Sequence, residues 1–77
     1  MIEILDAEVM KRDPSLVSYT MLFKNRTVFL NALTWFNNNN VLHQSLPVWR
    51  EIQPPRTVIY QCVCTPEMFT FFTLAFR

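Results

Sequence analysis

The alternation of apolar and polar residues at the start of the chain predicts a β-hairpin. Residues 2–10 fit two patterns, a helical spacing (Ile2, Leu5, Val9) and a strand-like alternation (Leu5, Ala7, Val9). Residues 16–24 alternate clearly, with four apolar side chains on one face: Val17, Tyr19, Met21 and Phe23. Asp13-Pro14-Ser15 supplies a turn between the two segments. We therefore favour a strand for residues 2–10, although the helical spacing leaves that alternative open.

A helix is expected next, from about Thr27 to Phe36. Its apolar residues recur at helical spacing and form a wide stripe: Val28, Phe29, Ala32, Leu33 and Phe36. Either Asn25 or Thr27 can cap its N-terminus. Four consecutive asparagines, residues 37–40, follow the helix in a chain that contains no glycine. One of them is expected to adopt the left-handed conformation that ends helices.

Residues 57–76 predict a second hairpin. Residues 57–65 are rich in Thr, Val, Ile and Tyr, which favour strands. Thr65-Pro66-Glu67 is expected to form the turn, and residues 68–76 to return as a strand. Both faces of that strand would be apolar, so it would lie centrally in the sheet or meet another chain.

The connection between the helix and this hairpin, residues 41–56, is interrupted by Pro47, Pro54 and Pro55. It is too rich in apolar residues for a solvated linker. We expect it to pack over the sheet or to contain a short extra strand or helical turn.

These elements predict one compact domain, residues 1–77, with an α+β fold: a small antiparallel sheet in β-β-α-β-β order with one helix packed on it. The composition adds an excess of apolar residues, since 51% of the chain is hydrophobic and 17% is charged, against about 25% charged in typical soluble domains. The excess indicates either a dense core or an interface with another chain.

The charge pattern argues against several partners and locations. A net charge of +1 is too small for the field of a dedicated nucleic-acid binder, so we expect no nucleic-acid partner. The N-terminus carries acids where a secretory signal needs bases, and the apolar stretch 68–76 has about half the length of a membrane helix. We expect a soluble, cytoplasmic protein without membrane contact, in the host cytoplasm if it is viral.

Residues for catalysis or metal binding are scarce. Cys62 and Cys64 would lie on the same face of a strand, about 6.5–7 Å apart along it, which is poor geometry for a disulfide. Their spacing is not that of a zinc site, so we expect core packing in a reducing compartment. His43, the single histidine, belongs to no nucleophile motif and is expected in an exposed loop. We predict no metal, no cofactor and no enzyme activity.

The acidic residues of the first segment are not expected to form a catalytic pair. Glu3 and Glu8 would fall on opposite faces of a regular strand. Together with Asp6, they are interpreted as residues that keep an edge strand soluble and unpaired.

The first hypothesis for function is a small non-catalytic protein-binding module. Its candidate partner-binding residues are aromatic, basic or large and apolar, the types that dominate interfaces: Trp49, Arg50, Ile52, Tyr60, Phe69 and Phe71. In size and scarcity of motifs the chain is similar to the small accessory proteins with which viruses and phages inhibit host factors by occupying their surface. The expected partner is another protein, or a further copy of the chain in a homo-oligomer.

The alternative hypothesis is a small-ligand or nucleotide binder with its site at a homo-oligomer interface. The residues that would contact the ligand are Arg26, Arg50, Arg56 and Tyr60. A chain this short can hardly enclose a pocket alone, so this alternative requires oligomers.

Overall fold

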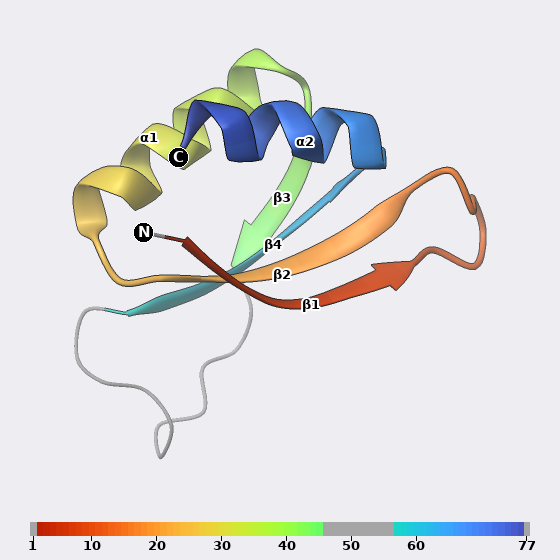
Figure 1. The fold of residues 1–77 in the computed structure, drawn as a ribbon, viewed down its shortest axis with the longest axis horizontal. Helices are drawn as coiled ribbons and strands as arrows, with labels where there is room; N and C mark the ends of the chain where they lie inside the picture. The colour runs from red at the N-terminus through yellow and green to blue at the C-terminus, as the bar shows by residue number, and fades with distance from the viewer. Residues whose placement is uncertain (1, 46–56, 77) are drawn as a thin grey trace.

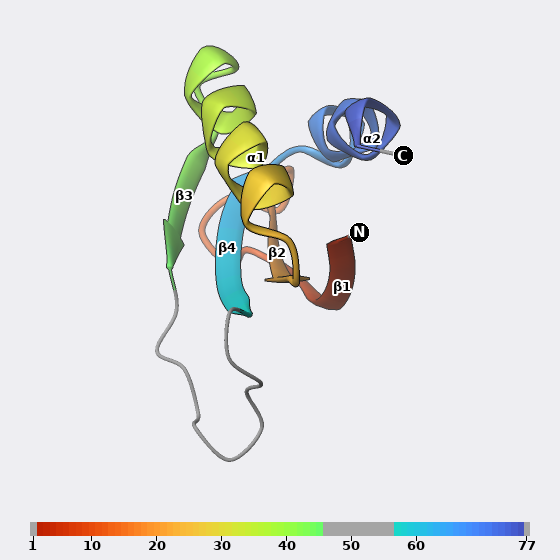
Figure 2. The ribbon, with the colours of Figure 1, turned by 90° about the vertical axis from the view of Figure 1, so that its left-hand side faces the viewer.

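A computed structural model of the chain describes residues 2–45 and 57–76 (Figure 1). The elements of these ranges are β1 (Ile2–Val9), β2 (Val17–Phe23), α1 (Arg26–Asn38), β3 (Leu42–Ser45), β4 (Val58–Cys64) and α2 (Pro66–Ala75). The strands form one sheet in the order β1-β2-β4-β3, and every neighbouring pair is antiparallel. Both helices lie on the same face of the sheet (Figures 1 and 2). The predicted α+β fold with a small antiparallel sheet is confirmed.

The hairpin predicted for the start of the chain is confirmed as β1 and β2, so residues 2–9 form a strand and not a helix. Its turn is stabilised locally. The side-chain oxygen Oδ1 of Asp13 accepts hydrogen bonds from the backbone N–H (3.1 Å) and the hydroxyl (2.5 Å) of Ser15. These two bonds hold the pKa of the exposed Asp13 carboxyl below its usual value.

A β-bulge between Ile4 and Asp6 changes which face the acids of β1 occupy. Glu3 lies opposite Leu22, but beyond the irregularity Asp6 and Glu8 lie opposite Thr20 and Ser18. Directly opposed residues of an antiparallel pair share a face, and Leu22, Thr20 and Ser18 alternate along β2. The expectation that Glu3 and Glu8 lie on opposite faces is therefore wrong. The bulge inserts one extra residue into β1, and this brings Glu8 to the same face as Glu3.

The inner face of the sheet carries the core. In β2 and β4 every second residue is buried against the helices: Val17, Tyr19, Met21, Phe23, Tyr60, Cys62 and Cys64. Ala32 and Phe36 of α1, Phe72 of α2 and Val41, which follows α1, belong to the same buried cluster. The ring of Phe72 lies 4.9 Å from that of Phe36 and 5.2 Å from that of Trp35. The two helices are thus packed on each other as well as on the sheet.

Both ends of helix α1 are capped by asparagines, as the sequence predicts. Asn25 is the N-cap, and its side chain accepts a hydrogen bond from the N–H of Val28 (3.1 Å). At the other end Asn40 has φ 55°, the left-handed conformation expected of one asparagine. The N–H of Val41 then donates to the carbonyl of Phe36 (2.9 Å), and the N–H of Asn40 donates to that of Asn37 (3.4 Å). This pair of bonds is the Schellman motif.

The left-handed residue yields a stability prediction. Replacing Asn40 with alanine should lower the free energy of unfolding by about 1 kcal/mol, because a Cβ without a polar side chain is disfavoured at positive φ. Replacing Asn40 with glycine should not lower it. Urea unfolding followed by circular dichroism measures both. Asn38→Ala is the control, since Asn38 is exposed within the helix; equal effects of the two alanine substitutions would contradict the prediction.

The strand predicted for residues 68–76 is wrong: this segment is helix α2. Thr65 acts as the N-cap and accepts a hydrogen bond from the N–H of Met68 (3.2 Å), and Pro66 occupies the first turn, where a proline needs no N–H donor. The residues interpreted as a turn are therefore a helix start. The order of elements becomes β-β-α-β-β-α, because the connection also contributes β3.

The two halves of the chain repeat one another in arrangement, although the sequence shows no repeat. Each half is a hairpin followed by a helix, and the order β1-β2-β4-β3 is unchanged when the halves are exchanged. Each helix begins by packing a phenylalanine on a tyrosine of the other half. Phe29 of α1 contacts Tyr60 of β4 (ring centroids 5.2 Å apart), and Phe69 of α2 stacks on Tyr19 of β2 (3.7 Å). The halves are therefore interleaved, which means that the helix of each half packs on a strand of the other.

The outer face of the sheet has no helix against it within the described ranges (Figure 2). A chain of side-chain hydrogen bonds crosses it: Gln44 donates to Gln61 (3.0 Å), and Gln61 donates to Ser18. Of the described helices, α1 with 13 residues and α2 with 10 are both too short to cross a membrane.

Candidate functional site

Four of the residues predicted to bind a partner or ligand lie outside the described residues: Trp49, Arg50, Ile52 and Arg56. Their roles stay predictions. The remaining ones, Arg26, Tyr60, Phe69 and Phe71, have defined positions on three different elements. These four residues do not form one surface.

Tyr60 lies in the core, with 8% of its surface exposed. Its ring packs between Phe29 and Phe36 of α1. Burial raises the pKa of its hydroxyl, so the phenol stays neutral at ordinary pH. In this position the ring offers almost no surface for a partner or ligand.

The hydroxyl of Tyr60 belongs to a short hydrogen-bonded chain through His43. The Nδ1 atom of His43 lies 2.7 Å from the Tyr60 hydroxyl, and Nε2 lies 2.9 Å from the Oδ1 atom of Asn37. In a neutral imidazole the hydroxyl donates to Nδ1, while Nε2–H donates to the amide oxygen, which can only accept. His43 lies in β3 and not in the exposed loop expected from sequence. Both its ring nitrogens are engaged, and the chain connects β3, β4 and α1.

Phe69 and Phe71 face different surroundings because α2 is a helix. Phe69 stacks on Tyr19 and packs against the core. Phe71 is 62% exposed, and Leu74, one turn further along, is 50% exposed. Between them in sequence, Phe72 is buried. Of the predicted partner-binding residues that the structure describes, Phe71 offers by far the largest accessible apolar surface.

The solvent-facing residues of α2 include three apolar side chains, Phe71, Leu74 and Ala75, which we call the outer side of α2, next to the polar Thr70 and Thr73. The helix contains one charged residue, Glu67 in its first turn. Sequence reasoning missed Leu74 as a surface residue because it treated the segment as a strand with two covered faces. The signals that identify the helix are the Thr65 cap and Pro66 at its start.

A second exposed surface is formed by β1. Every side chain from Glu3 to Val9 is exposed, including the large apolar residues Ile4, Leu5 and Val9. Opposite residues share a face, so Ile4, Ala7 and Val9 lie on the helix-facing side with Met21, Tyr19 and Val17. Those β2 partners are buried beneath the helices. The helix layer thus covers the inner face of β2 but leaves β1 exposed from Glu3 to Val9.

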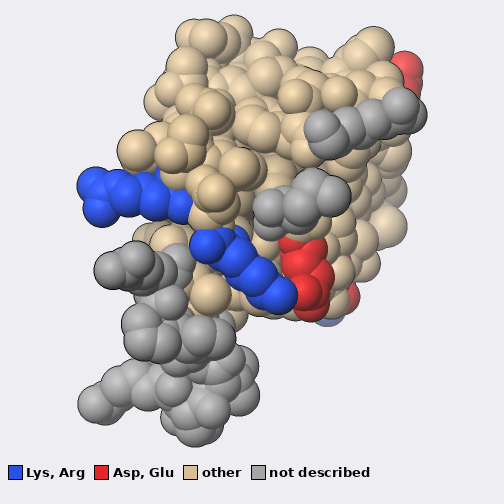
Figure 3. Space-filling view, turned by 60° about the vertical axis from the view of Figure 1, so that its left-hand side comes forward, with Lys and Arg blue, Asp and Glu red and all other residues tan. Residues whose placement is uncertain are grey.

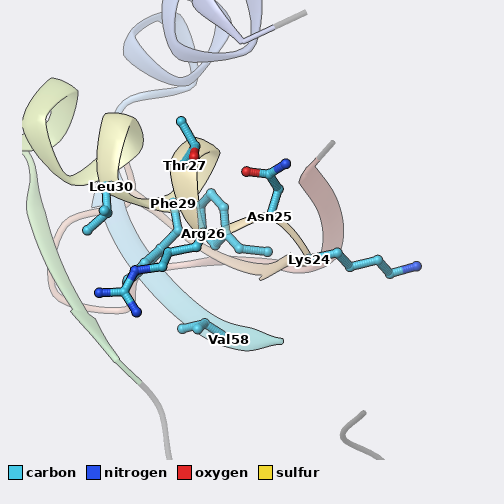
Figure 4. A pocket seen from close by; sticks show the side chains of 8 residues that line it. Lys24, Asn25, Arg26, Thr27, Phe29, Leu30 and Val58 are labelled. Carbon is cyan, nitrogen blue, oxygen red and sulfur yellow. The ribbon is translucent and has the colours of Figure 1, made fainter. Parts of the chain in front are cut away.

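Arg26 lines a hollow of about 730 Å³ at the start of α1, between α1 and the beginning of β4. Figure 4 shows its guanidinium reaching over β4 near Leu30, while the Lys24 side chain points away from the others. Tyr60 is not among the described lining residues. Of the residues in the ligand-binding hypothesis, the described part of this hollow contains Arg26 alone, and that hypothesis stays a prediction.

The two cysteine thiols are free and lie on the inner face of β4. Burial raises the pKa of both, most strongly that of Cys62, which has no exposed surface. They are neutral thiols at physiological pH and therefore poor nucleophiles. Among residues 2–45 and 57–76, no group of three or more potential metal ligands is close enough to hold an ion.

The described surface visible in Figure 3 is mostly neither acidic nor basic. In the described ranges, the one ion pair within 4 Å joins Lys24 and Glu3 (3.8 Å), both of which are well exposed. Such a pair contributes at most about 1 kcal/mol. Contacts with other molecules on this face would depend on uncharged side chains more than on charge.

Comparisons of the chain with protein-family models, with curated proteins and with solved structures gave no match. Inference about function therefore depends on the residues and their geometry.

Proposed function

We propose that the protein is a small, non-catalytic binding module that uses the outer side of α2 to contact an apolar surface on another protein or on a second copy of itself. One observation carries the proposal: Phe71 and Leu74 are at least half exposed on a helix with a single charged residue. The solvent-facing surface of a helix normally carries polar and charged side chains, so two large exposed apolar side chains one turn apart favour a covering partner.

The types of residue on this surface agree with binding. Exposed aromatic side chains supply large contact areas. Burial of Phe71 and Leu74 against a partner would contribute about 25 cal/mol of binding free energy for each Å² of apolar surface removed from water. Leu30 of α1 and the apolar residues of β1 are exposed as well. The apolar excess in the composition is thus found partly on the surface and not wholly in the core.

The chemistry of the remaining candidates supports a non-catalytic role. His43 has both ring nitrogens bonded within the protein, and the thiols of Cys62 and Cys64 are buried. A module of this kind acts by occupying its partner's surface, as an inhibitor does, and a viral or phage accessory protein acting on a host factor is our specific form of the proposal. Two buried free thiols favour a reducing compartment such as the cytoplasm.

The test begins with a photo-crosslinking amino acid at position 71, incorporated in the cells that produce the protein. We expect a discrete adduct from position 71 and none from position 31, because Asn31 is an exposed polar residue on α1. Affinity for the purified partner, or the self-association constant if the adduct is a dimer, then gives the quantitative result. Phe71→Asp should weaken it at least tenfold.

The matched control is Thr34→Asp, which places the same charge at an exposed position of the other helix, α1. It should weaken binding less than about threefold, and both substitutions should leave the free energy of unfolding within about 0.5 kcal/mol. Equal losses in the two variants, or unchanged binding in Phe71→Asp, would contradict the use of this surface.

A further inference from the structure

The outer edge of β1 is a free strand edge with an ordered pattern of side chains. β1 is the last strand of the sheet on its side: it pairs with β2 along one edge, and no strand of the described residues pairs with its other edge. An edge of this kind presents unpaired backbone N–H and C=O groups that can bind another extended segment. At eight residues, β1 is twice as long as the other edge strand, β3, which has four.

Because of the β-bulge, the three acidic side chains of β1 lie on one face of the sheet and three of its apolar side chains lie on the other. Glu3, Asp6 and Glu8 share the outer face of the sheet, opposite Leu22, Thr20 and Ser18. The apolar residues Ile4, Ala7 and Val9 share the inner face, beside the buried residues of β2. Lys24 is the one basic side chain of the described residues within 4 Å of these carboxylates, and it reaches Glu3. Asp6 and Glu8 thus have no ion-pair partner among them.

We infer that the edge of β1 binds an extended segment of another protein in which basic and apolar residues alternate. Pairing would continue the sheet by one strand. The basic side chains of that segment would lie on the outer face beside the three carboxylates, and its apolar side chains would lie beside Ile4, Ala7 and Val9. A strand has a side-chain period of two, so an alternating segment satisfies both faces at once.

Charge decides between this partner and a second copy of the chain. Pairing β1 with another β1 would bring the three carboxylates of each copy onto one edge, and like charges across a strand pair are destabilising. The acids therefore oppose self-association through β1, as edge charges commonly do. The same charges attract a basic strand. This inference goes beyond the proposed function, because it concerns another surface and requires neither Phe71 nor Leu74.

The probe is a capped synthetic peptide that alternates lysine and valine over about eight residues, matching the length of β1. Two control peptides are used. One has the same composition with the lysines grouped at one end, and the other alternates glutamate and valine. We expect the alternating lysine peptide to bind at least tenfold more tightly than either control, to protect backbone amides of β1 from hydrogen exchange, and to bind more weakly as salt rises.

Matched protein variants locate the site. Glu8→Lys should weaken binding of the alternating lysine peptide by about five- to tenfold, whereas Glu67→Lys, the same substitution at an exposed position on α2, should change it less than twofold. Phe71→Asp should also leave it unchanged. If the peptide does not bind but Phe71→Asp still weakens binding of the α2 partner, this inference is wrong and the proposed function is unaffected.

Three results overturn the inference. The first is equal affinity for the alternating and grouped lysine peptides, which would show charge attraction without strand pairing. The second is absence of binding or of amide protection in β1. The third is dimerisation of the protein through β1, seen as a doubled mass in light scattering together with protection of β1 amides in the absence of peptide, since that would make a second copy the occupant.

Discussion

Replacing Phe72 with alanine is expected to lower the free energy of unfolding by about 3–5 kcal/mol. Phe72 is 1% exposed, and its ring contacts the rings of Trp35, Phe36, Phe69 and Phe76. Alanine would leave a cavity where the two helices meet. A chain of 77 residues has a total stability of roughly 4–11 kcal/mol, so much of the protein should unfold at 37 °C. Urea unfolding followed by circular dichroism measures the loss.

Phe71→Ala is the matched control, because it removes the same side chain one position earlier, where the ring is largely exposed. Its effect should stay within about 0.5 kcal/mol. The pair also tests the nature of the segment. In a strand with two covered faces both substitutions would be costly, whereas helix α2 predicts one large and one negligible effect. Similar losses from the two alanine substitutions would contradict the helix.

Raising the pH above about 8.5 should destabilise the protein steeply under reducing conditions. Burial raises the pKa of the Cys62 and Cys64 thiols in the folded chain. Above the ordinary thiol pKa, the unfolded chain releases protons that the folded chain retains, so the unfolded state binds fewer protons and the free energy of unfolding falls as pH rises. Each fully buried thiol contributes up to about 1.4 kcal/mol per pH unit. Between pH 8.5 and 10.5 we expect a loss of roughly 2–4 kcal/mol.

The measurement is a series of urea unfolding curves at constant ionic strength, with a phosphine reductant present to keep the thiols reduced. Cys62→Ala is the informative variant, because Cys62 has no exposed surface and the more strongly raised pKa. It should reduce the slope between pH 8.5 and 10.5 by about half. Above pH 10, Tyr19 and Tyr60 add to the loss, since burial raises their pKa as well. An unchanged slope in Cys62→Ala would assign the pH dependence to other groups.

β2 and α1 were predicted directly, because their residues fit one period only. Tyr19 and Met21 alternate with the polar Ser18 and Thr20, and Asn25 precedes an apolar stripe at helical spacing. The segment that became α2 is different. Met68, Phe72 and Phe76 are separated by four residues, a spacing that places them on one side of a helix and also on one face of a strand. Periodicity alone could not decide, and the capping by Thr65 does.

The candidate binding surfaces were predictable only in part. Phe71 was identified from its residue type, but Leu74 required the helical geometry that places both on the outer side of α2. The shared face of Glu3 and Glu8 could not be predicted from β1 alone. A bulge is a property of a strand pair, and it depends on how Ile4 and Asp6 meet β2.

The interleaving of the two halves has a consequence for how quickly the chain folds. Tyr19 and Phe69 are 50 residues apart in sequence (69 − 19), and Phe29 and Tyr60 are 31 apart (60 − 29). Neither of these two ring contacts can form until the opposite hairpin has formed. A fold whose core depends on such distant pairs has a high contact order, and proteins of this kind fold more slowly than helical bundles of equal length. Until both hairpins have formed, the sides of α1 and α2 that later pack in the core would be exposed to other molecules.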